Sequence, residues 1–269
     1  MKKMENIHFI HANGFNPGAY CPLLNNLSSS FKITNFLLEP ISENKINYKN
    51  LKDWKYFQGK FENSIQKNKK IVGIGHSIGG NIILRSCINK PEYFSKIILL
   101  DPTLFIPRII FFWKLSLFLN LHNYAHPWAK ATLNRKMQYN SIDHIFKSYR
   151  NKEIFSKISD ENLLIYIKSI TKLKNKKINL TYPKEWEYQI YKTGLLVDQY
   201  IWKNIGNLEI PTLIIKARKS DTFLKSAETK INNLNKSNIK IISLDNCTHL
   251  FPLEIPNQVS KIISDFIAN

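Results

Sequence analysis

Short runs of apolar residues alternate with amphipathic segments along the chain, except between residues 105 and 205. Apolar side chains three or four positions apart predict helices within 20–27, 54–65, 81–89 and 256–267. Runs rich in Ile, Leu and Phe predict buried strands at 6–12, 31–38, 69–75, 95–101, 210–217 and 237–244. Strands that alternate with helices favour the α/β class, with a mostly or wholly parallel sheet of about six strands and helices on both faces.

The segment from 105 to 205 has a different pattern. It is aromatic and basic, and its apolar positions follow a helical spacing without clear strands. It comes after the fourth predicted strand, at the sheet edge where parallel α/β sheets bind ligands. We therefore divide the chain into a core of residues 1–104 and 206–269 and a helical insert of residues 105–205.

A serine stands between the third predicted strand and the helix after it, in the sequence GIGHSIGGN of residues 73–81. A G-x-S-x-G motif in this setting is typical of a nucleophile elbow, a strained turn that raises the serine above the sheet. Side chains at the two flanking positions would clash in such a turn, and both positions are glycine here. We expect Ser77 to be the nucleophile, with the N–H of Ile78 at the helix N-terminus facing an oxyanion.

A serine nucleophile needs a base, and the base needs a carboxylate that fixes its tautomer. His249 lies in the loop between the last predicted strand and the last helix, which places it at the same sheet edge as Ser77. For the acid we favour Asp221, in the loop after the fifth strand, with Asp101, at the end of the fourth strand, as the alternative. Asp245 is a weaker alternative because it lies only four residues before His249.

A second N–H for the oxyanion is expected from the loop after the first predicted strand, HANGFNPG at residues 11–18. A backbone amide would supply this hydrogen bond, so residue type is a weak guide. We favour Asn13 as the donor, with Gly14 and Phe15 as alternatives.

The segments FIHANGF, GHSIGG, IPTLIIKARKSDTF and CTHLFPLEIPNQVSKIISDFI have an order and spacing that resemble the α/β-hydrolase superfamily over nearly the full chain. The resemblance implies a triad of Ser77, Asp221 and His249, with the insert as a helical cap over the site. Two features depart from the family pattern. His11-Ala12 replaces the usual His-Gly, and the family's first two strands, one of them antiparallel, have no counterpart here. We therefore expect a compact, all-parallel sheet.

A serine at the elbow argues against the dehalogenases and epoxide hydrolases of this superfamily, which use Asp. It suits hydrolysis of a carboxylic ester, thioester or lactone through an acyl-enzyme. The apolar stretch 108–121 favours an apolar acyl chain or an aromatic group in the substrate. We name Phe15, His76 and Trp113 as candidate substrate contacts.

Two other functions stay open. A carbon–carbon bond hydrolase of meta-cleavage type vinylogous diketo acids would place a cation near the substrate carboxylate, with Arg85 or Arg108 as candidates. The second is a protein that has this fold and binds a ligand but does not catalyse a reaction. The presence of Ser77, Asp221 and His249 together argues against it.

Composition changes this picture little. The net charge is +19, but the lysines are scattered, the densest run at 168–177 is typical of a solvated surface, and no nucleic-acid-binding signature accompanies them. Three cysteines without a C-x-x-C pair, and a start without a secretory signal, favour the cytoplasm. We expect a small-molecule substrate, no nucleic acid, no cofactor and no metal. The apolar stretch of the cap also suits peripheral contact with a membrane, and the sequence sets no oligomeric state.

Overall fold

The six predicted strands form one sheet in the computed structural model, which describes residues 4–42, 46–66, 69–121, 127–194, 196 and 198–269. The strand order is β2-β1-β3-β4-β8-β9, and every neighbouring pair is parallel. The strands are β1 Asn6–Ile10, β2 Lys32–Phe36, β3 Ile71–His76, β4 Phe94–Leu100, β8 Thr212–Ala217 and β9 Ile239–Leu244. The predicted fold class, an all-parallel α/β sheet, is therefore confirmed.

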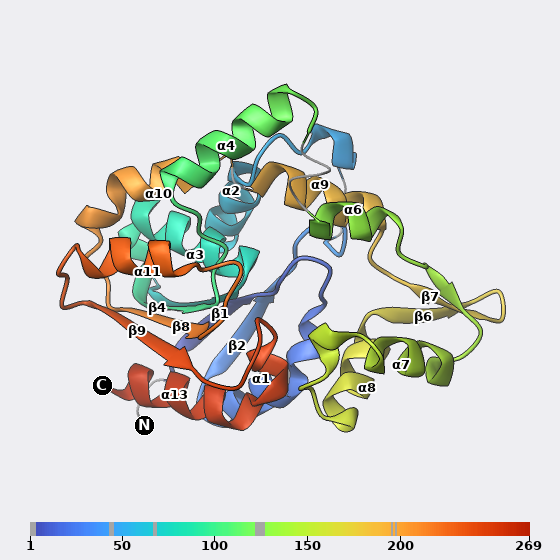
Figure 1. Ribbon diagram of the computed structural model, residues 1–269. Coiled ribbons are helices and arrows are strands. Elements are labelled where there is room, and N and C mark those ends of the chain that lie inside the picture. The colour runs from blue at the N-terminus through green and yellow to red at the C-terminus, as the bar shows by residue number, and fades with distance from the viewer. Residues whose placement is uncertain (1–3, 43–45, 67–68, 122–126, 195, 197) are drawn as a thin grey trace.

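Helices cover both faces of this sheet (Figure 1). They are α1 Cys21–Ser28, α2 Lys55–Ser64, α3 Ile78–Asn89, α11 Lys225–Asn232, α12 Phe251–Glu254 and α13 Pro256–Ala268. Helices α1 and α13 pack together on one face, whereas α2, α3 and α11 contribute to the apolar core on the other. Successive strand residues point to opposite faces, so β4 gives Ile98 to the first core and Ile97 to the second. Burial on both faces explains why the inner strands β3, β4 and β8 are nearly continuous apolar runs, whereas the edge strands β2 and β9 are partly exposed and contain polar residues.

The insert between β4 and β8 contains strands as well as helices. Its helices are α4 Pro107–Phe118, α6 Pro127–Leu133, α7 Ile142–Arg150, α8 Asp160–Ser169, α9 Lys184–Gly194 and α10 Asp198–Asn204. Three short strands, β5 Gln138–Tyr139, β6 Thr171–Lys174 and β7 Lys177–Leu180, form an antiparallel sheet in the order β5-β7-β6. The expectation of a segment without strands is therefore wrong.

A tight turn of Asn175 and Lys176 joins β6 to β7. Both residues have positive φ, at 51° and 58°. Two positive φ angles in a two-residue turn give the backbone twist that suits a β-hairpin, and asparagine tolerates this conformation well. The turn lies in the basic run 168–177, where the many lysines leave no clear alternation of apolar and polar residues to indicate a hairpin. In Figure 1 the hairpin projects from the rest of the molecule.

Buried side chains of the insert join both cores of the sheet. Tyr149 of α7 and Tyr166 of α8 belong to the core that contains α1 and α13, whereas Trp186 and Ile190 of α9 belong to the opposite core. The insert is thus packed against the rest of the molecule over both cores. The division at residues 105 and 205 stays a prediction.

Helix α4 carries a row of exposed apolar side chains. Phe111, Phe112, Leu115 and Phe118 are exposed, while Ile110 is buried. Among the helices that the structure describes, none combines the length and the apolarity needed to cross a bilayer. The expected contact between the cap and a membrane surface stays a prediction.

Candidate active site

Ser77 occupies a strained turn between β3 and α3. Its backbone angles are φ 58° and ψ −117°, a region that residues with a side chain rarely adopt. The amide of Ser77 donates to the carbonyl of Leu100 at 3.0 Å, and its carbonyl accepts from the amide of Thr103 at 3.1 Å. These bonds to the end of β4 and the segment after it hold the serine in place. The turn has the strand-to-helix geometry that the sequence predicts.

Gly75 and Gly79 flank the turn because a side chain fits at neither position. A Cβ atom on Gly75 would lie 2.2 Å from the backbone of Gly79, and one on Gly79 would lie 2.2 Å from the carbonyl oxygen of Ile10. Neither contact is sterically possible. Only glycine at both positions lets β1, β3 and α3 approach to backbone contact, which brings Ser77 beside the loop that follows β1.

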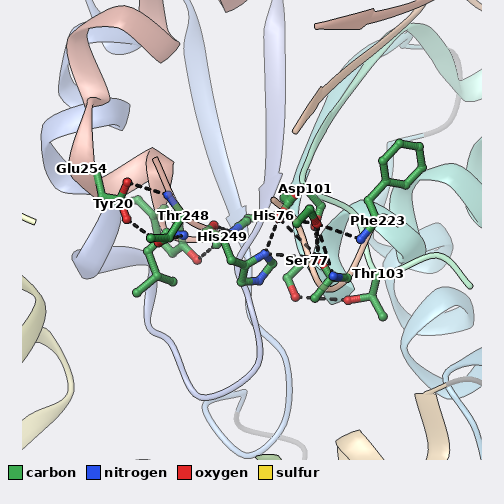
Figure 2. A network of polar contacts seen from close by, with 12 residues as sticks. Tyr20, His76, Ser77, Asp101, Thr103, Phe223, Thr248, His249 and Glu254 are labelled. Atoms are coloured by element: carbon green, nitrogen blue, oxygen red, sulfur yellow. Dashed lines mark hydrogen bonds and ion pairs between the residues drawn. The ribbon is translucent and has the colours of Figure 1, made fainter. Parts of the chain in front are cut away.

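His249 pairs with Asp101 at the carboxyl edge of the sheet (Figure 2). Nδ1 of His249 lies 2.7 Å from Oδ2 of Asp101, whose side chain is fully buried. An ionised carboxylate only accepts hydrogen bonds, so Nδ1 carries the proton and Nε2 is the basic nitrogen. The hydroxyl of Ser220 also donates to Asp101 Oδ2, at 2.9 Å, and fixes the carboxylate.

The carboxylate that bonds to His249 is the alternative of the sequence analysis, and the preference for Asp221 is corrected. Asp101 follows β4 directly, with a φ of 41° and an amide that donates to the carbonyl of Ile215 at 2.7 Å. The side chain of Asp221 is exposed and contributes to the pKa of His249 only through its charge. The loop after β8 reaches the histidine through Thr222 instead, whose hydroxyl lies 3.2 Å from Nδ1. Asp101 and Asp221 both end or follow a strand, so strand position could not separate them.

The environment of His249 favours its protonated form. Burial lowers the pKa of the ring, but the hydrogen bond and the charge of Asp101 outweigh this effect and raise the pKa above the usual histidine value. His249 is therefore a stronger base than a free histidine. The hydroxyl of Ser77 lies 3.2 Å from that of Thr103, and Figure 2 shows the side chains of Ser77, Thr103 and His249 close together.

Two backbone N–H groups beside Ser77 have no hydrogen-bond partner within the described part of the chain, those of Asn13 and Ile78. Ile78 begins α3, and the first N–H groups of a helix have no partner within it. Asn13, Ile78 and Ser77 line one common cavity. Both amides are thus available to an oxyanion formed on Ser77, and their role as its donors stays a prediction.

One of the two alternative donors is already engaged, because the amide of Phe15 donates to the carbonyl of Ala12 at 3.2 Å. The structure therefore favours Asn13 over Phe15 within the loop after β1, and Gly14 stays an alternative.

His76 is buried beneath the site and lines neither cavity at Ser77, which argues against its assignment as a substrate contact. Its side chain is fully buried, with Nδ1 accepting from the hydroxyl of Tyr20 at 2.7 Å and Nε2 donating to the carbonyl of His249 at 2.9 Å. The Tyr20 hydroxyl in turn accepts from the amide of Ala12 at 3.1 Å. This chain of hydrogen bonds links the loop after β1 to the loop that carries His249 (Figure 2). Sequence reasoning missed Tyr20 because its position matches the apolar face of a helix.

Two cavities meet at Ser77, Asn13 and His249. The smaller, of about 150 Å³, has an apolar wall that includes Trp54, Ile78, Phe105 and Ile190. The larger, of about 520 Å³, is bounded on one side by the loop after β1 and on the other by residues of the insert. Substrate access is therefore shaped by both the core and the insert.

The remaining predicted substrate contacts divide between these cavities and the protein interior. Phe15 lines the larger cavity, and its role as a substrate contact stays a prediction. Trp113 lines neither cavity, because it is on the buried side of α4 and its indole N–H donates to the carbonyl of Lys192 at 3.2 Å. This position argues against its assignment as a substrate contact.

The arginines considered for a substrate carboxylate also lie away from the two cavities. Arg85 is buried and donates from Nε to Gln58 Oε1 at 3.0 Å. Arg108 is exposed, with its guanidinium over the ring of Phe112. The cations that do line the larger cavity are Arg135, Lys136 and Lys152, all from the insert.

A parallel sheet with a serine on the strained turn after its third strand, and a histidine paired with a carboxylate at the same edge, is the architecture of an α/β-hydrolase. Within this class, residues 49–255 match the serine aminopeptidase family S33. The chain therefore belongs to that family.

Similar proteins agree with this class. The uncharacterized hydrolase YugF of Bacillus subtilis is 26% identical to this chain over 212 residues. The matched region covers 74% of this chain and 66% of YugF, which is just under two thirds of that protein. The crystal structure of E-2-(acetamidomethylene)succinate hydrolase has a TM-score of 0.75 at 15% identity and covers 99% of this chain and 92% of its own. The thioesterase domain from the curacin biosynthetic pathway has the same TM-score at 12% identity, with 98% and 92% covered. At identities of 15% and 12%, these similarities show a shared fold and nothing about the substrate.

Proposed function

We propose that this protein is a serine hydrolase that cleaves a carboxylic ester, or a related thioester or lactone, through an acyl-enzyme. The observation that carries the proposal is the position of Ser77 on its strained turn, beside the hydrogen-bonded pair of His249 and Asp101. The apolar wall of the smaller cavity supports an apolar acyl or aromatic group at one end of the substrate.

In the proposed reaction, Ser77 Oγ attacks the carbonyl carbon while its proton passes to His249 Nε2. The amides of Asn13 and Ile78 donate to the oxygen that becomes negative, and Asp101 stabilises the imidazolium. The C–O bond to the alcohol then breaks, and His249 gives its proton to the leaving oxygen. Water, deprotonated by the same nitrogen, attacks the acyl-enzyme and releases the acid and the free serine.

The two alternatives have less support. Cleavage of a carbon–carbon bond was expected to use Arg85 or Arg108, and neither lines the cavities at Ser77. A protein that only binds ligands would have no use for a strained serine, and strain of this kind is typical of functional sites.

The first test is hydrolysis of 4-nitrophenyl butyrate by the wild type and by Ser77→Ala. We expect the substitution to lower kcat by about 10³-fold or more, because it removes the nucleophile. A fluorophosphonate should label the wild type and leave Ser77→Ala unlabelled, while the exposed control Ser28→Ala is labelled normally. Equal hydrolysis by wild type and Ser77→Ala would refute the proposal.

A second assay separates ester from amide and carbon–carbon bond cleavage. An aminoacyl 4-nitroanilide represents the substrate type in the name of the S33 family, and a ring-cleavage diketo acid represents the carbon–carbon alternative. We expect kcat/KM to be highest for the ester. A higher value for either of the others would replace the ester assignment and leave Ser77 as the nucleophile.

A further inference from the structure

Lys136 and Lys152 stand in the wall of the larger cavity, and neither ammonium has a carboxylate partner among the described residues. Each lies over an aromatic ring instead. Lys152 Nζ is 4.3 Å from the ring centre of Tyr149, and Lys136 Nζ is 5.1 Å from that of Tyr139. Both tyrosines are buried, so each ammonium lies on a ring that is itself held in the wall.

Arg135 adds a third cation to the same wall but is already neutralised. Its Nη1 lies 2.5 Å from Oε2 of the buried Glu187, and its Nη2 donates to the carbonyl of Tyr182 at 3.3 Å. Glu187 is the carboxylate among the residues that line this cavity. Three cations against one carboxylate leave Lys136 and Lys152 as the uncompensated charges.

The positive charges also act on one another. Lys152 is exposed, but partial burial of its ammonium in the wall lowers its pKa, the charge of Arg135 lowers it further, and Glu187 offsets part of the effect. The charges of Arg135 and Lys152 repel each other, and an anion beside them relieves this repulsion and accepts a hydrogen bond from Lys152. The wall that carries these charges also contains Ser77 and His249, so a ligand in the cavity can reach both the lysines and the site of the proposed reaction.

We propose that the larger cavity binds an anionic group of the substrate, so that the ester cleaved at Ser77 carries a carboxylate held by Lys152 and Lys136. The inference rests on the proposed function and adds the chemical class of the substrate. The apolar end of the same molecule would occupy the smaller cavity, which meets the larger one at Ser77.

The test compares esters that differ only in one charge. The first pair is 4-(butyryloxy)benzoate and 4-(butyryloxy)benzamide, with the carboxylate on the leaving group. The second is mono-4-nitrophenyl glutarate and 4-nitrophenyl pentanoate, with the carboxylate on the acyl group. We expect the charged member of at least one pair to have a kcat/KM roughly tenfold higher, as one charge-assisted hydrogen bond allows. The pair that responds shows which half of the substrate the cavity binds.

The variant Lys152→Gln should remove most of this preference for the charged ester, whereas Lys152→Arg should retain it. Lys174→Gln is the matched control, because Lys174 is exposed on the hairpin and its loss changes the net charge of the protein equally. No preference in either pair, or equal losses in Lys152→Gln and Lys174→Gln, would overturn the proposal.

Binding tests the inference separately from turnover. Titration of Ser77→Ala with the charged ester of each pair measures affinity for the intact ester, and we expect at least one of these affinities to be roughly tenfold weaker when Lys152→Gln is added. If the wild type hydrolyses no ester but this binding and its Lys152 dependence are found, the proposed function fails and the anion site stands. If esters are hydrolysed but the charged and neutral members bind equally in both pairs, the anion site fails and the hydrolase stands.

Discussion

On the core side of the site, Asp101 and His76 are fully buried, and each is hydrogen-bonded to a neighbouring loop. On the insert side, Lys136 and Lys152 are exposed and rest on aromatic rings. Removal of a core group would leave buried polar partners unsatisfied, whereas removal of an insert lysine would leave its place to water. Substitutions in the core should therefore impair every substrate, and substitutions in the insert should select among substrates.

The largest effect should come from Asp101→Asn, on the core side. An amide can donate to Nδ1 of His249 and favour the wrong tautomer, so we expect kcat to fall by about 10³–10⁴-fold for neutral and charged esters alike. The pKa of His249 should fall, because Asp101 raises it in the wild type. The acid limb of the kcat/KM profile, where activity is lost as pH drops and the base becomes protonated, should therefore move to lower pH.

The matched control for this substitution is Asp221→Asn. Its side chain is exposed and acts on His249 only through its charge, so kcat should stay within a few-fold of the wild type. Both variants are measured from pH 5 to pH 9 with 4-nitrophenyl butyrate. A larger loss of kcat in Asp221→Asn than in Asp101→Asn would contradict the assignment of Asp101 as the partner of His249.

A smaller effect is expected at the junction of core and insert, where Asp198 joins three segments. The carboxylate accepts from Asn81 Nδ2 of α3 at 2.6 Å and from the amide of Phe105 at 3.0 Å, close to the first residue of the insert. Burial raises the pKa of Asp198 to about 7, against the pull of these hydrogen bonds and of Arg85. The folded state therefore keeps a proton that the unfolded chain releases near pH 4.

The stability that Asp198 contributes through this proton is fully present below about pH 4 and is lost as the pH rises towards 7. Between pH 5 and pH 8 it should lower the free energy of unfolding by about 2–3 kcal/mol. Asp198→Asn removes that part of the pH dependence, and the exposed control Asp143→Asn keeps it. Urea unfolding at the two pH values measures the difference. An unchanged pH dependence in Asp198→Asn would show that the junction is not proton-linked.

The comparison between core and insert also decides what the sequence could predict. The strands, the turn at Ser77 and the loop of His249 depend on local patterns: apolar runs, glycines where backbones touch, and a position after the last strand. The partner of His249 could not be predicted in this way, since Asp101 and Asp221 both lie at the carboxyl edge. The φ of 41° at Asp101 and the hydroxyl of Ser220 decide between them, and both are tertiary features.

The insert was harder to predict because some of its residues lie in the protein interior and others in the wall of a cavity, and the sequence pattern does not separate the two. Trp113 looks like a ligand contact in an apolar stretch, yet its indole packs inward and bonds to the backbone near Lys192. Lys152 looks like one of many surface lysines, and only the fold places it over Tyr149 in the wall of a cavity. Neither position has a local pattern that would distinguish it from its neighbours.

The smallest effect concerns the outer surface of the insert, where Phe118 on α4 is 83% exposed. No acidic residue occurs between Asp101 and Asp143, whereas this stretch contains five lysines and arginines, among them Lys114 on the same helix. An exposed apolar row in a basic segment suits the surface of an anionic bilayer. We predict sedimentation of the protein with vesicles rich in phosphatidylglycerol and little with phosphatidylcholine alone. Phe118→Ser should weaken the partition coefficient about fivefold, since burial of an exposed phenyl ring is worth about 1–2 kcal/mol at an interface.

Leu173→Ser is the matched control, because Leu173 is also exposed but lies on the hairpin of the insert. Equal partition of Phe118→Ser and Leu173→Ser would mean that α4 makes no special contact with lipid. Hydrolysis of a water-soluble ester should be the same in both variants, because Phe118 lines neither cavity at Ser77. A loss of that activity in Phe118→Ser would show instead that the outer surface of the insert is coupled to the site. The division between chemistry in the core and substrate recognition in the insert would then be incomplete, because the outer surface would also affect catalysis.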